Sequence, residues 1–150
     1  MSAASQVPSP EQVAEARKHV LDRVKFMPRS LEGTIEMDPQ FAIGFANFWE
    51  MFMGDGALPQ KIKELMYLAI GVSHVSPACL VHAIAAIECG ATDQELAEAV
   101  KLGVLSAGMV PNGPGMPYAM PYAGKVLEIA AKYRAGEDWE YLTPAQFKMD

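Results

Sequence analysis

One cysteine and one histidine lie three residues apart at the predicted start of a helix, a spacing that could support chemistry. Ser76 and Pro77 are residue types that begin helices, as the N-cap and the first helical residue, which would place Cys79 at the third position. Unpaired amides and the helix dipole stabilise a thiolate there, so the pattern predicts a depressed pKa for Cys79. His82 would lie close to the same face, where imidazole and thiol can exchange a hydrogen bond or a proton. The pair therefore indicates nucleophilic or redox catalysis.

Glu64 and His74 are the other candidates near this pair. A Glu64 carboxylate aimed at a buried His82 would orient and charge the imidazole, although a solvated residue of the first helical turn is the alternative. We interpret His74 as a helix-end histidine that hydrogen-bonds terminal carbonyls, and Ser76 as an N-cap rather than a catalytic hydroxyl. Both could still support the site. Together with Cys79, these residues fit no standard zinc spacing, so neither a metal nor a cofactor is expected.

Each cysteine also has a purely structural interpretation, because a free cysteine is commonly a small buried side chain. For Cys79 the residues alone leave the structural and the reactive role equally open, whereas for Cys89 the structural role is favoured. The two lie ten residues apart on one predicted helix. That separation is about 15 Å along the axis, beyond the reach of a disulfide within an intact helix.

The elements that position these residues are predicted to be helices, because apolar residues recur at three- and four-residue steps and no segment alternates with a period of two. The expected fold is all-α, with about six helices. The segment that begins at Pro59 is apolar on nearly all sides and is expected at the centre of the bundle. The expected helices cover residues 11–27, 39–54, 59–70, 77–90, 92–109 and 118–135.

Length and charge narrow the class of protein. With 150 residues and 51% hydrophobic side chains, we expect a flexible lead-in over residues 1–10 and a single helical domain over residues 11–150. A net charge of −6 disfavours nucleic acid as a partner. The longest apolar stretches, residues 65–72 and 81–87, are too short to cross a bilayer, and the N-terminus does not look like a signal peptide. No membrane association and a cytoplasmic location are the resulting expectations.

Two stretches, LPQKIKELMYLAI at residues 58–70 and ACLVHAIAAIECGATDQELAEAV at residues 78–100, resemble the carboxymuconolactone decarboxylase and alkylhydroperoxidase D superfamily. The resemblance spans residues 31–131. It implies a small all-helical subunit that assembles into a homo-oligomer, a trimer or a hexamer, with sites near subunit boundaries. The similar features are the KxKEL segment at Glu64, the histidine eight residues before Gly90-Ala91-Thr92, and a Tyr-Ala helix at Tyr118-Ala119 or Tyr122-Ala123.

The superfamily's redox members carry a glutamate, a CxxC pair and a histidine, in which one thiolate attacks peroxide and the other resolves it. By this resemblance Glu64 matches the glutamate, Cys79 the second cysteine and His82 the histidine, with one residue fewer between the last two. Ser76 stands where the first cysteine would be, so no internal disulfide can form. A sulfenate at Cys79 would then need an external thiol as its reductant.

Three functions remain open, in the following order. The first is a single-cysteine thiol redox enzyme of the alkylhydroperoxidase D type, a peroxidase acting on a small molecule with Cys79, His82 and Glu64 as catalytic residues. The second is a lyase of the carboxymuconolactone decarboxylase type that uses acid–base chemistry at His82 and Glu64. The third is a binding or assembly protein that kept the fold and lost the chemistry.

Overall fold

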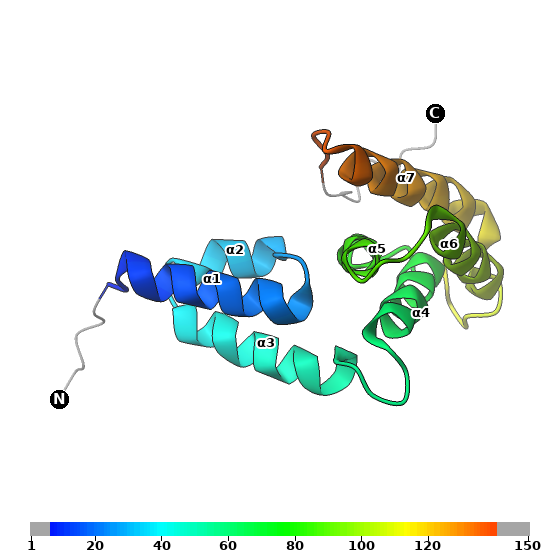
Figure 1. The fold of residues 1–150 in the computed structure, drawn as a ribbon. Helices are drawn as coiled ribbons and strands as arrows, with labels where there is room; N and C mark the ends of the chain where they lie inside the picture. The colour runs from blue at the N-terminus through cyan, green and yellow to red at the C-terminus, as the bar shows by residue number, and fades with distance from the viewer. Residues whose placement is uncertain (1–6, 141–150) are drawn as a thin grey trace. The chain divides into compact units, whose positions relative to one another are not determined.

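The structure is a computed structural model that describes residues 7–140. Within this range the chain forms seven α-helices and no strand, which confirms the all-α prediction (Figure 1). Most of the expected lead-in, residues 1–6, lies outside the described range. The chain divides into two compact units, Met1–Gly54 and Asp55–Asp150. The single domain expected over residues 11–150 stays a prediction, and each unit is described by itself.

The first unit contains α1 (Pro10–Val24), α2 (Arg29–Ile35) and α3 (Pro39–Met53). Ser9 begins α1 with a capping box, and the Asp38 carboxylate accepts the Phe41 amide at the start of α3, as the Asp-Pro pair predicts. The seven-residue α2 was not expected. It has no side-chain cap and contains Gly33, so its sequence carries no strong helix signal. The helices enclose a small core of Ala16, Val20, Val24, Leu31, Ile35, Ala42 and Ala46.

The second unit contains α4 (Gln60–Ser73), α5 (Cys79–Glu88), α6 (Asp93–Ala107) and α7 (Met116–Ala135). The expected capping box is present at α6, where Thr92 and Glu95 bond each other's backbone amides. Helix α4 contacts α5, α6 and α7, so its predicted central place within this unit is confirmed. The core of the unit is built on Leu68, Val72, Leu80, Leu96, Val100, Tyr122 and Val126.

Two glycines let the helices of the second unit approach α4 closely. A Cβ atom at Gly71 would lie 2.5 Å from the Cys79 Cβ, and one at Gly103 would lie 2.6 Å from the Ala69 carbonyl oxygen. Distances this short are not tolerated without movement of the neighbouring helix. The absence of a side chain at these positions therefore determines how closely α5 and α6 pack against α4.

We expect Gly71→Ala to lower the free energy of unfolding by roughly 1–3 kcal/mol, because the added methyl overpacks the contact between α4 and Cys79. Gly124→Ala in α7 is the matched control, since a Cβ there meets no atom within 4 Å. That control is expected to stabilise the helix by up to about 1 kcal/mol. Urea unfolding followed by circular dichroism measures both changes, and equal effects of the two substitutions would contradict the packing argument.

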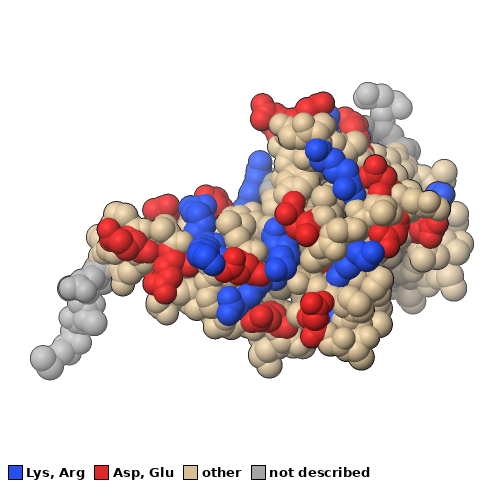
Figure 2. Space-filling view, in the orientation of Figure 1, with Lys and Arg blue, Asp and Glu red and all other residues tan. Residues whose placement is uncertain are grey.

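Charged side chains of both signs are interspersed on the face of the first unit seen in Figure 2. Two ion pairs connect its helices, Arg17 with Glu32 at 2.7 Å and Arg23 with Glu50 at 2.8 Å. Among residues 7–140, no helix is long and apolar enough to cross a membrane. The same residues contain no group of three or more His, Cys, Asp or Glu side chains that could hold a metal ion.

Candidate active site

A carboxylate and an imidazole form a buried pair between α4 and α5. Glu64 Oε2 lies 2.8 Å from His82 Nδ1. The Glu64 side chain is fully buried and His82 is 6% exposed. Glu64 occupies this position because it falls on the stripe of α4 that faces the core, four residues before Leu68 and eight before Val72. The sequence left open whether Glu64 approaches His82 or is solvated in the first turn, and the structure places the two side chains in direct contact.

The pair has the arrangement that prepares a histidine for proton transfer. An ionised carboxylate only accepts hydrogen bonds, so Nδ1 of His82 donates to Glu64 Oε2. This bond fixes the tautomer and the orientation of the ring. The other ring nitrogen, Nε2, is then the hydrogen-bond acceptor of the ring.

A buried glutamine holds the second oxygen of Glu64. Gln60 lies one helical turn before Glu64, and its Nε2 donates to Glu64 Oε1 over 3.3 Å. The backbone amide of Gln60 donates in turn to the Asp55 carboxylate at 2.7 Å. Both oxygens of the buried carboxylate therefore have partners, as a buried charge requires. Sequence reasoning missed Gln60, although its position four residues before Glu64 was the available signal.

Tyr67 is the exposed part of the site. Its ring centroid lies 5.0 Å from that of His82, with an angle of 31° between the ring planes, while the residue remains about half exposed. Tyr67 follows Glu64 by three residues, so both project toward α5 from neighbouring positions on α4. Tyr67 was not among the residues predicted for the site. Its position places a partly exposed aromatic ring beside the buried imidazole.

Cys79 does not have the properties that the sequence predicted. The side chain is fully buried, and its Sγ lies 3.2 Å from the Tyr122 hydroxyl of α7. Burial raises the pKa of Cys79 to about 12, because a thiolate loses its hydration there, and the hydrogen bond with Tyr122 lowers the pKa only in part. The predicted depressed pKa is therefore wrong. The sulfur also bonds to the phenol rather than to the imidazole of His82.

The start of α5 explains part of this difference. The helix begins at Cys79, with Ala78 rather than Ser76 as its N-cap residue, and Ala78 makes no side-chain cap. Residues 76–78 form a turn, in which the Cys79 amide donates to the Ser76 carbonyl at 3.1 Å. The Ser76 hydroxyl accepts from the Ala78 amide at 3.4 Å. The prediction that Ser76 caps this helix is thus wrong, and the hydrogen bond from the Cys79 backbone amide to its own sulfur lowers the pKa of the thiol less than burial raises it.

Tyr122 contributes a buried phenol to the second unit. The sequence offered Tyr118 and Tyr122 as equivalent positions, and the structure buries Tyr122 completely while leaving Tyr118 exposed. Burial raises the pKa of Tyr122 above its usual value, and the neighbouring Cys79 adds to this increase. Cys79 favours the neutral form of Tyr122, whereas the Tyr122 hydroxyl partly lowers the pKa of Cys79. The contact between Cys79 and Tyr122 is therefore suited to holding α5 against α7.

His74 has the structural role that the sequence favoured. It is the C-cap residue of α4, is exposed, and its Nδ1 lies 2.9 Å from the Ile70 carbonyl oxygen. A second contact joins the same nitrogen to the Ser73 hydroxyl at 3.0 Å. His74 therefore provides a hydrogen-bond partner for a carbonyl group in the last turn of α4. Of the residues singled out in the sequence, Glu64 and His82 form one site, and Cys79 has a different partner. His74 bonds the end of α4, and Ser76 bonds the turn that precedes α5.

Comparison with known proteins gives one match. The family model described as the carboxymuconolactone decarboxylase family matches residues 39–112, a segment that contains Glu64, Cys79 and His82. No curated protein and no solved structure matches this chain.

Proposed function

Since this chain belongs to the carboxymuconolactone decarboxylase family, we propose that it is an enzyme that transfers a proton to a small molecule through His82. The observation that carries the proposal is the 2.8 Å contact between His82 Nδ1 and Glu64 Oε2 in a buried site. A histidine whose tautomer is fixed by a carboxylate is a general acid–base catalyst. His82 is the proton-transfer residue, whereas Glu64 and Gln60 position it.

The reaction we propose is the decarboxylation of a small lactone or a related unsaturated acid. The bond between the carboxylate carbon and its neighbour breaks, carbon dioxide leaves, and the electron pair passes to a carbon conjugated with the lactone carbonyl. Protonated His82 donates the proton on Nε2 to that carbon, and the ring regains a proton from water. Throughout, Nδ1 keeps its hydrogen bond to Glu64, which holds the ring in one orientation during the step.

The thiol peroxidase hypothesis loses its support at Cys79. A thiolate is the nucleophile in that reaction, and a thiol with a pKa near 12 holds almost none at neutral pH. The cysteine is also buried, and its partner is a phenol rather than a second thiol. For these reasons we assign Cys79 a structural role, and the proposed reaction requires no external thiol as reductant.

Turnover in heavy water tests the proposed reaction. In deuterium oxide the enzyme is expected to release carbon dioxide from a γ-lactone carboxylate and to place one deuterium on the product carbon, which mass spectrometry detects. Hydrogen peroxide supplied with dithiothreitol is expected to be consumed no faster than in buffer alone. Peroxide turnover that Cys79→Ser abolishes would replace this proposal with the redox one. A folded chain that turns over neither class of substrate would favour the non-catalytic alternative.

A further inference from the structure

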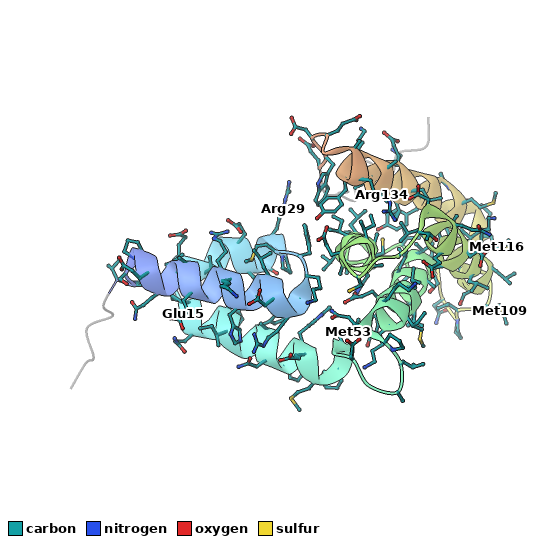
Figure 3. All side chains as sticks on the ribbon, viewed as in Figure 1. Glu15, Arg29, Met53, Met109, Met116 and Arg134 are labelled. Carbon is teal, nitrogen blue, oxygen red and sulfur yellow. The ribbon has the colours of Figure 1, made fainter. Side chains whose placement is uncertain are left out.

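Tyr67 is the most exposed residue of the candidate active site. Helices α4 and α5 lie side by side, and side chains occupy the space between them (Figure 3). His82 is 6% exposed and Glu64 is fully buried, whereas Tyr67 is 46% exposed. The centroids of the Tyr67 and His82 rings are 5.0 Å apart. A small molecule that reaches the imidazole from solvent beside α4 therefore contacts Tyr67.

The Tyr67 hydroxyl has no hydrogen-bond partner among residues 7–140. The neighbouring polar groups of the site are bonded to each other. Gln60 Nε2 donates to Glu64 Oε1, and His82 Nδ1 donates to Glu64 Oε2. A phenol hydroxyl can donate one hydrogen bond and accept others. Tyr67 therefore offers a ligand a donor that the described part of the chain does not use.

The proposed decarboxylation needs a hydrogen-bond donor in addition to its acid. When carbon dioxide leaves, the electron pair of the broken bond is delocalised through the conjugated system onto the lactone carbonyl oxygen, which becomes an enolate oxygen. Donors aimed at an oxygen that gains charge usually make the largest single contribution to such catalysis. Glu64 cannot act as this donor, because an ionised carboxylate only accepts hydrogen bonds. His82 uses Nε2 to protonate carbon, so a separate donor is required beside it.

We propose that the Tyr67 hydroxyl donates a hydrogen bond to the carbonyl oxygen of an unsaturated carbonyl compound bound beside His82, an assignment that rests on the proposed function. Tyr67 holds the enolate oxygen while protonated His82 transfers the proton on Nε2 to the conjugated carbon. The electron pair then forms the new carbon–hydrogen bond, and the carbonyl double bond is restored. Tyr67 keeps its own proton throughout. Rings 5.0 Å apart can contact two atoms of one small substrate at the same time.

The sequence of α4 keeps these groups together. Glu64 and Tyr67 are three residues apart, so they occupy neighbouring positions on one face of the helix. The same helix thus supplies the carboxylate that orients His82 and the phenol that lies beside its ring. Groups placed on a helix are held more precisely than groups placed on a loop. Tyr67 is therefore a catalytic residue in this proposal, because it touches the substrate.

Binding of 4-nitrophenol tests the oxygen site without any turnover. Its phenolate is a planar anion with charge on oxygen, like the proposed enolate, so it should bind to the same donor. We expect the wild-type chain to bind the probe in an absorbance titration at pH 7.5. Tyr67→Phe keeps the ring and removes only the hydroxyl. This variant should weaken binding about 10- to 100-fold, the range expected for one hydrogen bond to a charged group.

Tyr118→Phe on α7 is the matched control, because Tyr118 is 60% exposed and is not part of the candidate active site. It should bind the probe as tightly as the wild type. Absence of binding by the wild-type chain would overturn the proposal, as would equal affinities in Tyr67→Phe and the wild type. An equal loss in Tyr67→Phe and Tyr118→Phe would also contradict it, since the effect would not be specific to Tyr67.

Kinetics with the γ-lactone carboxylate test the catalytic role of the same hydroxyl. Tyr67→Phe is expected to lower kcat about 10²- to 10³-fold with little change in KM, because the hydrogen bond strengthens as the oxygen gains charge. A wild-type chain that binds 4-nitrophenol through Tyr67 but releases no carbon dioxide would contradict the proposed function and leave the oxygen site standing. Full activity in Tyr67→Phe would contradict the role of Tyr67 and leave proton transfer at His82 standing.

Discussion

Substitution of His82 by alanine is expected to lower kcat/KM for decarboxylation at least about 100-fold, and up to about 10⁴-fold. The substitution removes Nε2, the atom that we propose donates the proton, and leaves the Glu64 carboxylate in place. The variant would keep only the small rate enhancement over the uncatalysed reaction that substrate binding provides. Steady-state kinetics with the γ-lactone carboxylate measure the loss, and circular dichroism checks that the variant is folded.

Glu64→Gln separates the positioning role from simple packing. The amide has nearly the shape of the carboxylate, but its NH₂ group can donate to Nδ1 and so favour the wrong tautomer of His82. We expect a loss of about 10²-fold or more in kcat with little change in KM. The ¹⁵N chemical shifts of the imidazole should show the tautomer change directly, without any substrate. An unchanged tautomer with full activity would contradict the role given to Glu64.

His74→Ala provides the matched histidine control. His74 is exposed and bonds the end of α4, so its removal is expected to cost a little stability and to leave kcat unchanged. An equal loss of activity in His74→Ala and His82→Ala would indicate that both substitutions act through the folded structure, and it would contradict a specific catalytic role for His82. Retention of activity within about threefold in His82→Ala would remove the proposed mechanism.

Local signals predicted most of the fold. The Asp38-Pro39 pair and the Thr92 capping box each mark a helix start through bonds between residues three apart, and both are present in the structure. The start of α7 is also close to the predicted one. Helix α2 was missed because its stability comes from packing Leu31 and Ile35 into the core of the first unit, a property that its own seven residues do not display.

The site was predictable where one residue stands out from the pattern of its own helix, and not where a side chain's surroundings come from helices far along the chain. Glu64 is a charge on an apolar face, which is a visible anomaly that requires a partner, and His82 supplies it. The environment of Cys79 is set by Gly71 on α4 and by Tyr122, which lies 43 residues further along the chain. Neither contact can be read from the neighbours of Cys79 in the sequence. The helix-start pattern indicated an ionised thiol, and tertiary burial overrides it.

Cys79 is expected to react with iodoacetamide at pH 7.5 about 10³-fold more slowly in the folded chain than in urea. A pKa of about 12 in place of 9 lowers the thiolate fraction by about three powers of ten, and burial limits access further. The pH profile gives the sign of the shift. Because only the thiolate reacts, the rate should rise tenfold per pH unit toward pH 12, whereas an ordinary thiol levels off near pH 9.

Cys89 is the internal control for this measurement, because it is a free cysteine that is only partly buried. Peptide mass spectrometry distinguishes the two labelled sites, and Cys89 should be labelled first. Tyr122→Phe removes the hydroxyl that partly lowers the pKa of Cys79, so it should not increase labelling of the folded chain. Cys79 labelled as fast as Cys89 at pH 7.5 would mean that the sulfur is both exposed and ionisable. That result would favour the redox function over the proposed decarboxylation.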